Sequence, residues 1–286
     1  MLELLINPKR AEKKPWQMFL IGFFYASLSL FLSWLLFSKD AVLSKYLGIF
    51  VITFCVIFSM PFVYYTIKLE ERKDIIYSNE KNLLKEHSRA ILTFLWLFLG
   101  FIVAFSLWNI LVPNGGKYFN AQIETFCQIN RPANFNECVQ EYGIEEKKYT
   151  VGSVIGSERF SSIFSNNIYV LIFTLLLSVA FGAGAIFILA WNASVIAAAI
   201  SIFIRSDIAK LPIGLARYLI HGLPEVCAYF IAALSGGILG IAVIRHDTKS
   251  ERFWSIINDS MILVIIAIVI LFLATLIEVF ITPRLF

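Results

Sequence analysis

Apolar and charged segments alternate along the first part of the chain. Three apolar runs of about 22 residues are long enough, as helices, to cross a hydrocarbon core of about 30 Å. These runs are residues 16–37, 46–67 and 90–111. The pattern predicts three membrane-spanning helices. About fifteen polar residues precede the first run, which is itself long enough to span, so we expect no cleaved signal peptide.

The segment 68–89, between the second and third runs, is charged and contains no proline or glycine. Leu69, Ile76 and Leu83 recur in it at seven-residue intervals. A narrow apolar stripe of this kind predicts a helix that packs on a neighbour or on the membrane surface. The first region, residues 1–111, is therefore expected to hold three spans and one charged helix.

The segment 112–166 is polar and rich in turn-forming residues. Three crossings from a cytoplasmic N-terminus would place it outside the cell as an exterior loop. Cys127 and Cys138 would then lie in an oxidising compartment, where we expect a disulfide worth about 2.5–3 kcal/mol in the chain-entropy model; two free thiols are the alternative. Cys55 and Cys227 lie in apolar spans, where cysteine acts as a small hydrophobic residue.

The third region, residues 167–286, contains two apolar stretches that are too long for one span each. Residues 168–204 carry no charge, and residues 211–244 carry very few ionisable side chains. Both stretches are expected to be broken or re-entrant helices, the first of them near Gly182 to Gly184 or at Trp191-Asn192. With a final span at 261–281, the chain would have about six or seven spans.

The second stretch carries the sequence His221-Gly222-Leu223-Pro224-Glu225. Gly222 can adopt the angles that end a helix, and Pro224 suits the first turn of the next. Glu225 would then lie in that first turn, where the helix dipole favours negative charge. The sequence predicts a helix break inside the bilayer. A centred acidic group costs about 2.5–3.5 kcal/mol there, so we expect surrounding helices to shield Glu225.

Polar side chains within these spans form a candidate intramembrane site. They are Asn166, Asn167, Asn192, Arg217, His221 and Glu225. His221 and Glu225 either satisfy one another or nearby backbone groups, or line a cavity or conduction path. The asparagines are expected to bond between helices, and Arg217 could neutralise Glu225. Helix breaks and close packing are expected at Gly182, Gly184, Gly222, Pro224, Gly236, Gly237 and Gly240.

Composition excludes a large soluble enzyme domain. Hydrophobic residues make up 59% of the chain and charged residues 15%, whereas soluble domains carry about 25% charged residues. The fold class is therefore an all-α, polytopic transmembrane helix bundle. Basic residues crowd before the first run and within 68–89, which predicts a cytoplasmic N-terminus. Acidic residues interrupt the second cluster, so we expect no nucleic-acid partner.

Several short motifs together resemble the stage II sporulation protein M family. They are Phe164-Ser165-Asn166-Asn167, Gly182 with Gly184, Trp191-Asn192-Ala193, the His221–Glu225 block, and Phe230-Ile231-Ala232-Ala233 with Gly236-Gly237. The resemblance covers about 164–240 well and the N-terminal half loosely; Asn7-Pro8-Lys9-Arg10 and Lys13-Lys14-Pro15-Trp16 look like archaeal members. It implies a multi-spanning, non-catalytic membrane protein. The family's sporulation members remodel septal membrane and cell wall with wall-degrading partners.

Three classes of function remain open. The resemblance favours a membrane assembly or remodelling component that binds membrane lipids and other membrane proteins, with a homodimer possible. A transporter or channel with a polar site at the broken helices is the alternative. The third is an intramembrane metal-dependent hydrolase using His221 and Glu225.

The sequence argues against the hydrolase. Gly222 and Pro224 would spoil the helical face that metal ligands four residues apart need, and only His87 and His246, in polar segments, could complete a site. The chain shows no nucleotide, haem or nucleophile motif. We therefore expect no enzyme activity, no metal and no cofactor.

Overall fold

The computed structural model describes residues 8–77, 83–112, 118–130, 134–141, 156–182, 185–204, 208–245 and 251–285. Within these residues the chain is helical and contains no strand. Seven helical segments are long and apolar enough to cross a membrane. The all-α polytopic bundle expected from the sequence is confirmed, and the number of candidate spans is the larger of the two expected.

The N-terminal region packs three long helices and one short one. They are α1 (Pro8–Lys13), α2 (Gln17–Phe37), α3 (Leu47–Tyr77) and α4 (Leu83–Leu111), with the 3-10 turn η2 (Leu43–Tyr46) before α3. The first three apolar runs correspond to α2, α3 and α4. The segment 68–89 is not a separate helix: its first part continues α3, and its last part begins α4. Without proline or glycine, nothing in the sequence ends α3 at the membrane boundary.

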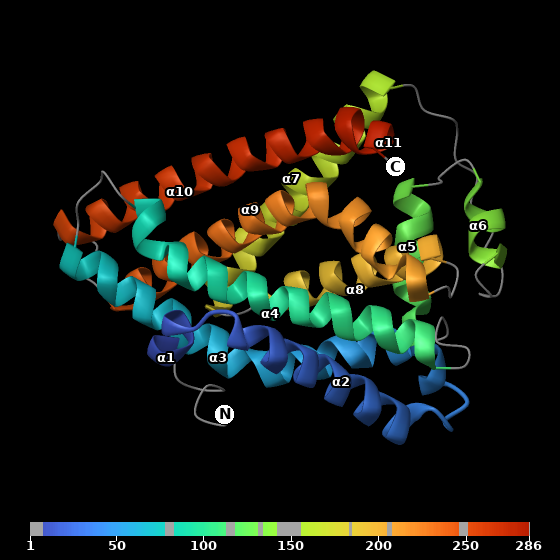
Figure 1. Cartoon of the computed structure of the whole chain (residues 1–286). Helices are drawn as coiled ribbons and strands as arrows, with labels where there is room; N and C mark the ends of the chain where they lie inside the picture. The colour runs from blue at the N-terminus through green and yellow to red at the C-terminus, as the bar shows by residue number, and fades with distance from the viewer. Residues whose placement is uncertain are drawn as a thin grey trace.

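The segment between α4 and α7 is partly structured. It holds α5 (Asn120–Asn130) and α6 (Phe135–Glu141), which the disulfide between Cys127 and Cys138 joins, as expected. Helix α5 packs against α8 and α3, and Figure 1 shows α5 and α6 together at one end of the bundle. We call this the α5 end. The opposite end, where α3 stops and α4 starts, is the α3–α4 end.

The first overlong stretch divides at one of its two expected positions. Helix α7 (Gly156–Phe181) stops at Gly182, and α8 (Ile186–Ile204) follows. Gly182 has φ of 65°, in the left-handed region that glycine adopts at helix ends. Asn192 lies inside α8, so no break occurs at Trp191-Asn192, and Gly184 is outside the described residues. Both α7 and α8 are long enough to span; a re-entrant course for either stays a prediction.

The second overlong stretch does not divide. After the 3-10 turn η6 (Ile208–Lys210), α9 runs from Leu211 to Arg245 with Pro224 inside it. The break predicted at Gly222 to Pro224 is therefore corrected: the backbone stays helical, and the ribbon of α9 bends (Figure 1). Membrane helices tolerate an internal proline because neighbouring helices and local adjustments satisfy the backbone groups it frees.

The chain ends with α10 (Glu251–Leu276), a π-helical turn η7 (Ile277–Ile281) and α11 (Thr282–Leu285). Among the spans, α9 is the most buried, and it packs against α7, α8, α10 and α3. Figure 1 shows α9 between α10 and α4 in the middle of the bundle. Polar residues on α9 can therefore meet partners from several other spans.

Close approach of α7 and α9 depends on glycine. A Cβ atom at Gly236 would lie 2.6 Å from the carbonyl oxygen of Leu175, and one at Gly240 would collide with that of Val179. Gly222 has ordinary space, because a Cβ there would lie 3.6 Å from Ile196 Cδ1. The glycine face of α9 is thus covered within the chain itself.

Candidate functional site

The candidate site is centred on a contact between α7 and α9. Asn167 Nδ2 donates a hydrogen bond of 2.6 Å to Glu225 Oε1, across 58 residues of sequence. Its neighbour Asn166 donates a longer bond of 3.4 Å to Asn167 Oδ1. Asn167 is buried, whereas Asn166 is exposed. Two of the six predicted polar residues therefore make a direct contact between spans, and a third extends it.

A second carboxyl group completes this contact. Glu278, in the π-helical turn after α10, shares a side-chain hydrogen bond with Glu225. A hydrogen bond between two carboxyl groups requires a proton on one of them. π-Helical turns are rare and occur frequently at functional sites. The arrangement is therefore an amide and two carboxyl groups drawn from α7, α9 and the turn η7.

His221, one turn before Glu225 on α9, has a different partner. Its Nδ1 lies 3.2 Å from Thr282 Oγ1, and the Thr282 hydroxyl donates its proton to the carbonyl oxygen of Ile277 at 3.2 Å. Since that proton is already used, His221 Nδ1 is the donor to Thr282. His221 and Glu225 thus each bond to the C-terminal segment, and the described contacts of these two side chains include no bond between them.

Two predicted members of the site lie elsewhere. Asn192 Nδ2 donates to the carbonyl oxygen of Ile188 in its own helix, at 2.8 Å, so this bond does not join helices. The guanidinium of Arg217 lies 5.0 Å from the ring centroid of Phe203, within the range of a cation–π contact. The described contacts therefore place Arg217 against an aromatic ring of α8.

Sequence reasoning missed Glu278 and Thr282. A signal for Glu278 was present, because it is the only charged residue between Asp259 and Arg284 in a long apolar run. A lone carboxyl group in a span is a candidate for function by default. Thr282 carries no comparable signal, since threonine is common in membrane helices and bonds to its own backbone.

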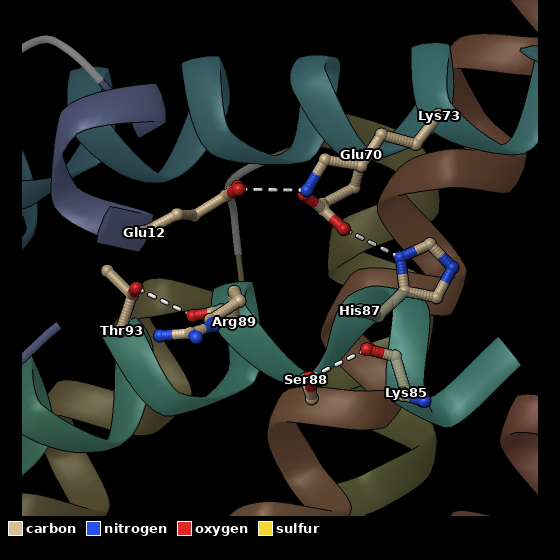
Figure 2. Close-up of polar contacts among 8 residues, drawn as sticks. All are labelled: Glu12, Glu70, Lys73, Lys85, His87, Ser88, Arg89 and Thr93. Atoms are coloured by element: carbon tan, nitrogen blue, oxygen red, sulfur yellow. Dashed lines mark hydrogen bonds and ion pairs between the residues drawn. The ribbon is translucent and has the colours of Figure 1, made fainter. Parts of the chain in front are cut away.

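A second polar group lies at the α3–α4 end (Figure 2). Lys73 Nζ on α3 bonds to Glu12 Oε2 on α1 at 2.9 Å and also to Glu70. Glu70 Oε2 lies 2.7 Å from His87 Nδ1 on α4. Glu70 and His87 are both 0% exposed, so His87, expected near the surface, is a core residue. We call Glu12, Lys73, Glu70 and His87 the α1 clamp.

Burial raises the pKa of Glu12 to about 7, and the hydrogen bond and negative charge of Glu70 act in the same direction. Lys73 opposes this shift by favouring the charged carboxylate. The α1 clamp therefore contains a carboxyl group that titrates near neutral pH. Its physical role is to hold the short helix α1 against α3 and α4.

The continuity of α9 removes one sequence argument against a metal site at His221 and Glu225, but the described residues do not supply such a site. Because α9 is continuous, His221 and Glu225 do lie four residues apart on one helical face, which the predicted break would have prevented. The described residues nevertheless contain no group of three His, Cys, Asp or Glu side chains that could hold a metal ion. His246 lies outside the described residues.

The comparisons with known proteins agree with the motifs in the C-terminal half. A family model described as "Stage II sporulation protein M" matches residues 50–283, which includes most of α3, the helices from α4 to α10 and the turn η7 with Glu278. No curated protein and no solved structure matches the chain. The family match covers most of the chain and contains the contact between Asn167, Glu225 and Glu278. The chain belongs to the stage II sporulation protein M family.

Proposed function

We propose that the protein is a non-enzymatic membrane assembly component that works by binding other membrane proteins. Family membership supports this class of function. The described residues also fit it, because long apolar helices make up most of them and short segments connect most of the spans. Docking surfaces in such a protein must lie at the ends of the bundle or on its lipid-facing sides.

The observation that carries the proposal is the unit formed by α5 and α6. Its own apolar side chains Phe126, Phe135 and Val139 are buried. Gln122 Nε2 on α5 donates a 3.2 Å hydrogen bond to the carbonyl oxygen of Gly48 on α3. The disulfide ties α6 to this seated helix. A surface already held in place loses less conformational entropy when a partner binds.

The face of this unit turned away from the bundle is polar. Gln128, Asn134 and Glu137 are exposed there. Exposed polar side chains on a rigidly held structural unit suit binding to a partner in an aqueous compartment. With a cytoplasmic N-terminus, three crossings would place this face outside the cell, which we propose as the orientation.

Native mass measurement in mild detergent would test the proposal. Protein purified from its own membranes should contain a second protein in fixed ratio, with a mass that is no multiple of the 32.5 kDa chain. Glu137→Lys should release that partner. Glu251→Lys is the matched control, because Glu251 is also an exposed carboxylate and lies at the α3–α4 end. A homo-oligomer alone, or equal loss in both variants, would refute this function.

The contact between Asn167, Glu225 and Glu278 favours a second candidate function, a transporter or channel. Polar groups inside membrane bundles often mark ion or proton pathways. Here two carboxyl groups and an amide meet between spans, and His221 lies one turn away. A pathway through this point would use the carboxyl pair as its site for a proton or cation.

Flux measurements separate the two candidates. Purified protein in liposomes with an imposed proton or sodium gradient should show specific flux if it is a transporter. Glu225→Gln and His221→Ala should abolish that flux, while Asn192→Ala, whose amide bonds within its own helix, should leave it unchanged. Flux no greater than in empty liposomes would remove this candidate.

A further inference from the structure

The acidic side chains that the structure describes on α1, α3 and α4 at the α3–α4 end are turned inward. Glu70 is 0% and Glu71 1% exposed, and the side chain of Glu12 is 13% exposed. Lys73 holds Glu12 and Glu70, and His87 binds Glu70 from α4. The α1 clamp therefore takes negative charge away from the surface of this end.

Basic side chains of the same three helices remain outside. Those exposed to solvent, with Lys14 directly after α1, are Lys9, Arg10, Lys13, Lys14, Arg72, Lys85 and Arg89. Among the described side chains of α1, α3 and α4 at this end, the exposed charges are thus basic. Glu251, at the start of α10, is an exposed carboxylate at the same end. The positive surface is therefore confined to α1, α3 and α4.

A bilayer around the candidate spans would place its lipid headgroups at the level of this surface. Lys13 and Lys14 are separated by Pro15 alone from Trp16, which is 53% exposed and precedes the span α2. Tryptophan prefers the membrane–water interface. Arg72 lies at the last turn of one candidate span, and Arg89 lies in the first turn of the next. The phosphates of the surrounding bilayer are therefore the anions closest to these side chains.

We propose that α1, with the adjoining ends of α3 and α4, forms a docking surface for the headgroups of anionic phospholipids. Lysine and arginine are the natural partners of phosphate, and basic clusters beside a span bind anionic lipid. The mixed charge of the sequence hides this surface, because among the described side chains of α1, α3 and α4 at this end the acidic ones are turned inward and most of the basic ones are exposed. The inference is independent of the proposed partner at the α5 end.

The α1 clamp makes this surface an organised one. Ala11 is 0% exposed against the bundle, and Glu12 on the next position is bonded to Lys73. Lys9 and Lys13 therefore project from a helix that is held in place. Basic residues on a loosely held segment would attract anionic lipid through their charge alone. Lipid binding by a fixed α1 can therefore be distinguished by experiment from binding through charge alone.

Native mass spectrometry of the full chain in nanodiscs tests the proposal. The discs contain phosphatidylcholine with a minor share of phosphatidylglycerol, and the number of retained phosphatidylglycerol molecules is counted. Lys13→Gln with Lys14→Gln should weaken retention about fivefold per lysine. The control is Lys39→Gln with Lys45→Gln, two exposed lysines between α2 and α3, which should retain wild-type binding. Equal retention in the two double variants would overturn the proposal.

Glu12→Ala, which removes the carboxyl group and with it the bond to Lys73, separates an organised surface from general attraction. The change makes the protein more positive, so attraction through charge alone predicts more retained phosphatidylglycerol. The docking surface predicts less, since α1 loses its bond to Lys73. Retention at or above the wild-type level would overturn the organised surface. Glycerol phosphate added to the discs should not displace the lipid; displacement would assign the surface to soluble phosphate instead.

Discussion

Asn167 on α7 donates its amide proton to the carboxylate of Glu225 on α9, at 2.6 Å. The two residues belong to different spans and to different motifs of the sequence. Lipid offers neither group an alternative partner, so separating α7 from α9 would leave a polar group unsatisfied. The bond therefore couples the packing of two spans to the state of a carboxyl group.

Asn167→Leu should lower the free energy of unfolding by about 1–2 kcal/mol, because it removes this bond to a carboxyl group. Titration with a denaturing detergent, followed by circular dichroism, would measure the change. Asn192→Leu is the control and should cost less, since its amide bonds within one helix. An equal loss of unfolding free energy in the two variants would mean that the bond between Asn167 and Glu225 adds nothing to stability.

Gly236→Ala should destabilise the bundle by about 1–3 kcal/mol, because the new methyl group would lie 2.6 Å from the carbonyl oxygen of Leu175 and force α7 away. Gly222→Ala should be neutral or stabilising by about 0.5–1 kcal/mol, since alanine favours helix and the site has space. The same unfolding titration applies. A similar loss at both positions would contradict the close packing of α7 on α9.

Attachment of α1 should weaken as pH rises. The pKa of Glu12 is raised from 4.5 to about 7 in the folded protein, so the folded state binds more protons than the unfolded state between these values. Stability from this group is complete below pH 4.5 and is lost as pH rises through about 7. Glu70 and Lys73 on α3 face it, with His87 behind them.

A spin label at Lys9→Cys would report this change as greater mobility at pH 8 than at pH 5. The variant Glu12→Gln carries no titrating group at that position, so its label should show a much smaller dependence on pH. Mobility that falls with rising pH would contradict the assigned direction.

Cysteine counting would check the disulfide. In the denatured, unreduced protein a maleimide polymer should modify two thiols, Cys55 and Cys227, and after reduction it should modify four. Replacing Cys127 and Cys138 by serine should cost about 2.5–3 kcal/mol in the stability of the α5–α6 unit, from the chain entropy of the loop. Four reactive thiols without reduction would contradict the bond.

Labelling of introduced cysteines would test the orientation. With seven crossings and a cytoplasmic N-terminus, Ser206→Cys should react with an impermeant maleimide in intact cells. Ser250→Cys should react only after permeabilisation. The reverse pattern would place the N-terminus outside, and labelling of both from one side would mean that α9 does not cross.

Helix breaks illustrate how far local sequence can predict structure. Gly182 ends α7 because the left-handed conformation is open to glycine, a property of one residue. Gly222 and Pro224 have the same local character but lie inside a continuous helix, because α9 packs on several neighbours that sustain its backbone. Local propensity therefore decides where a helix ends if few neighbours pack against it. Where many neighbours pack against the helix, those contacts decide instead.

Sequence alone determined the membrane bundle, the family, and the polar residues Asn167, His221 and Glu225, because burial of a polar group in an apolar run is visible along the chain. Only the tertiary structure decided which groups meet. Glu278 reaches Glu225 and Thr282 reaches His221 because the turn η7 brings the end of the chain back to α9. Glu70 and His87 became core residues in the same way, since contacts between distant segments depend on how helices pack.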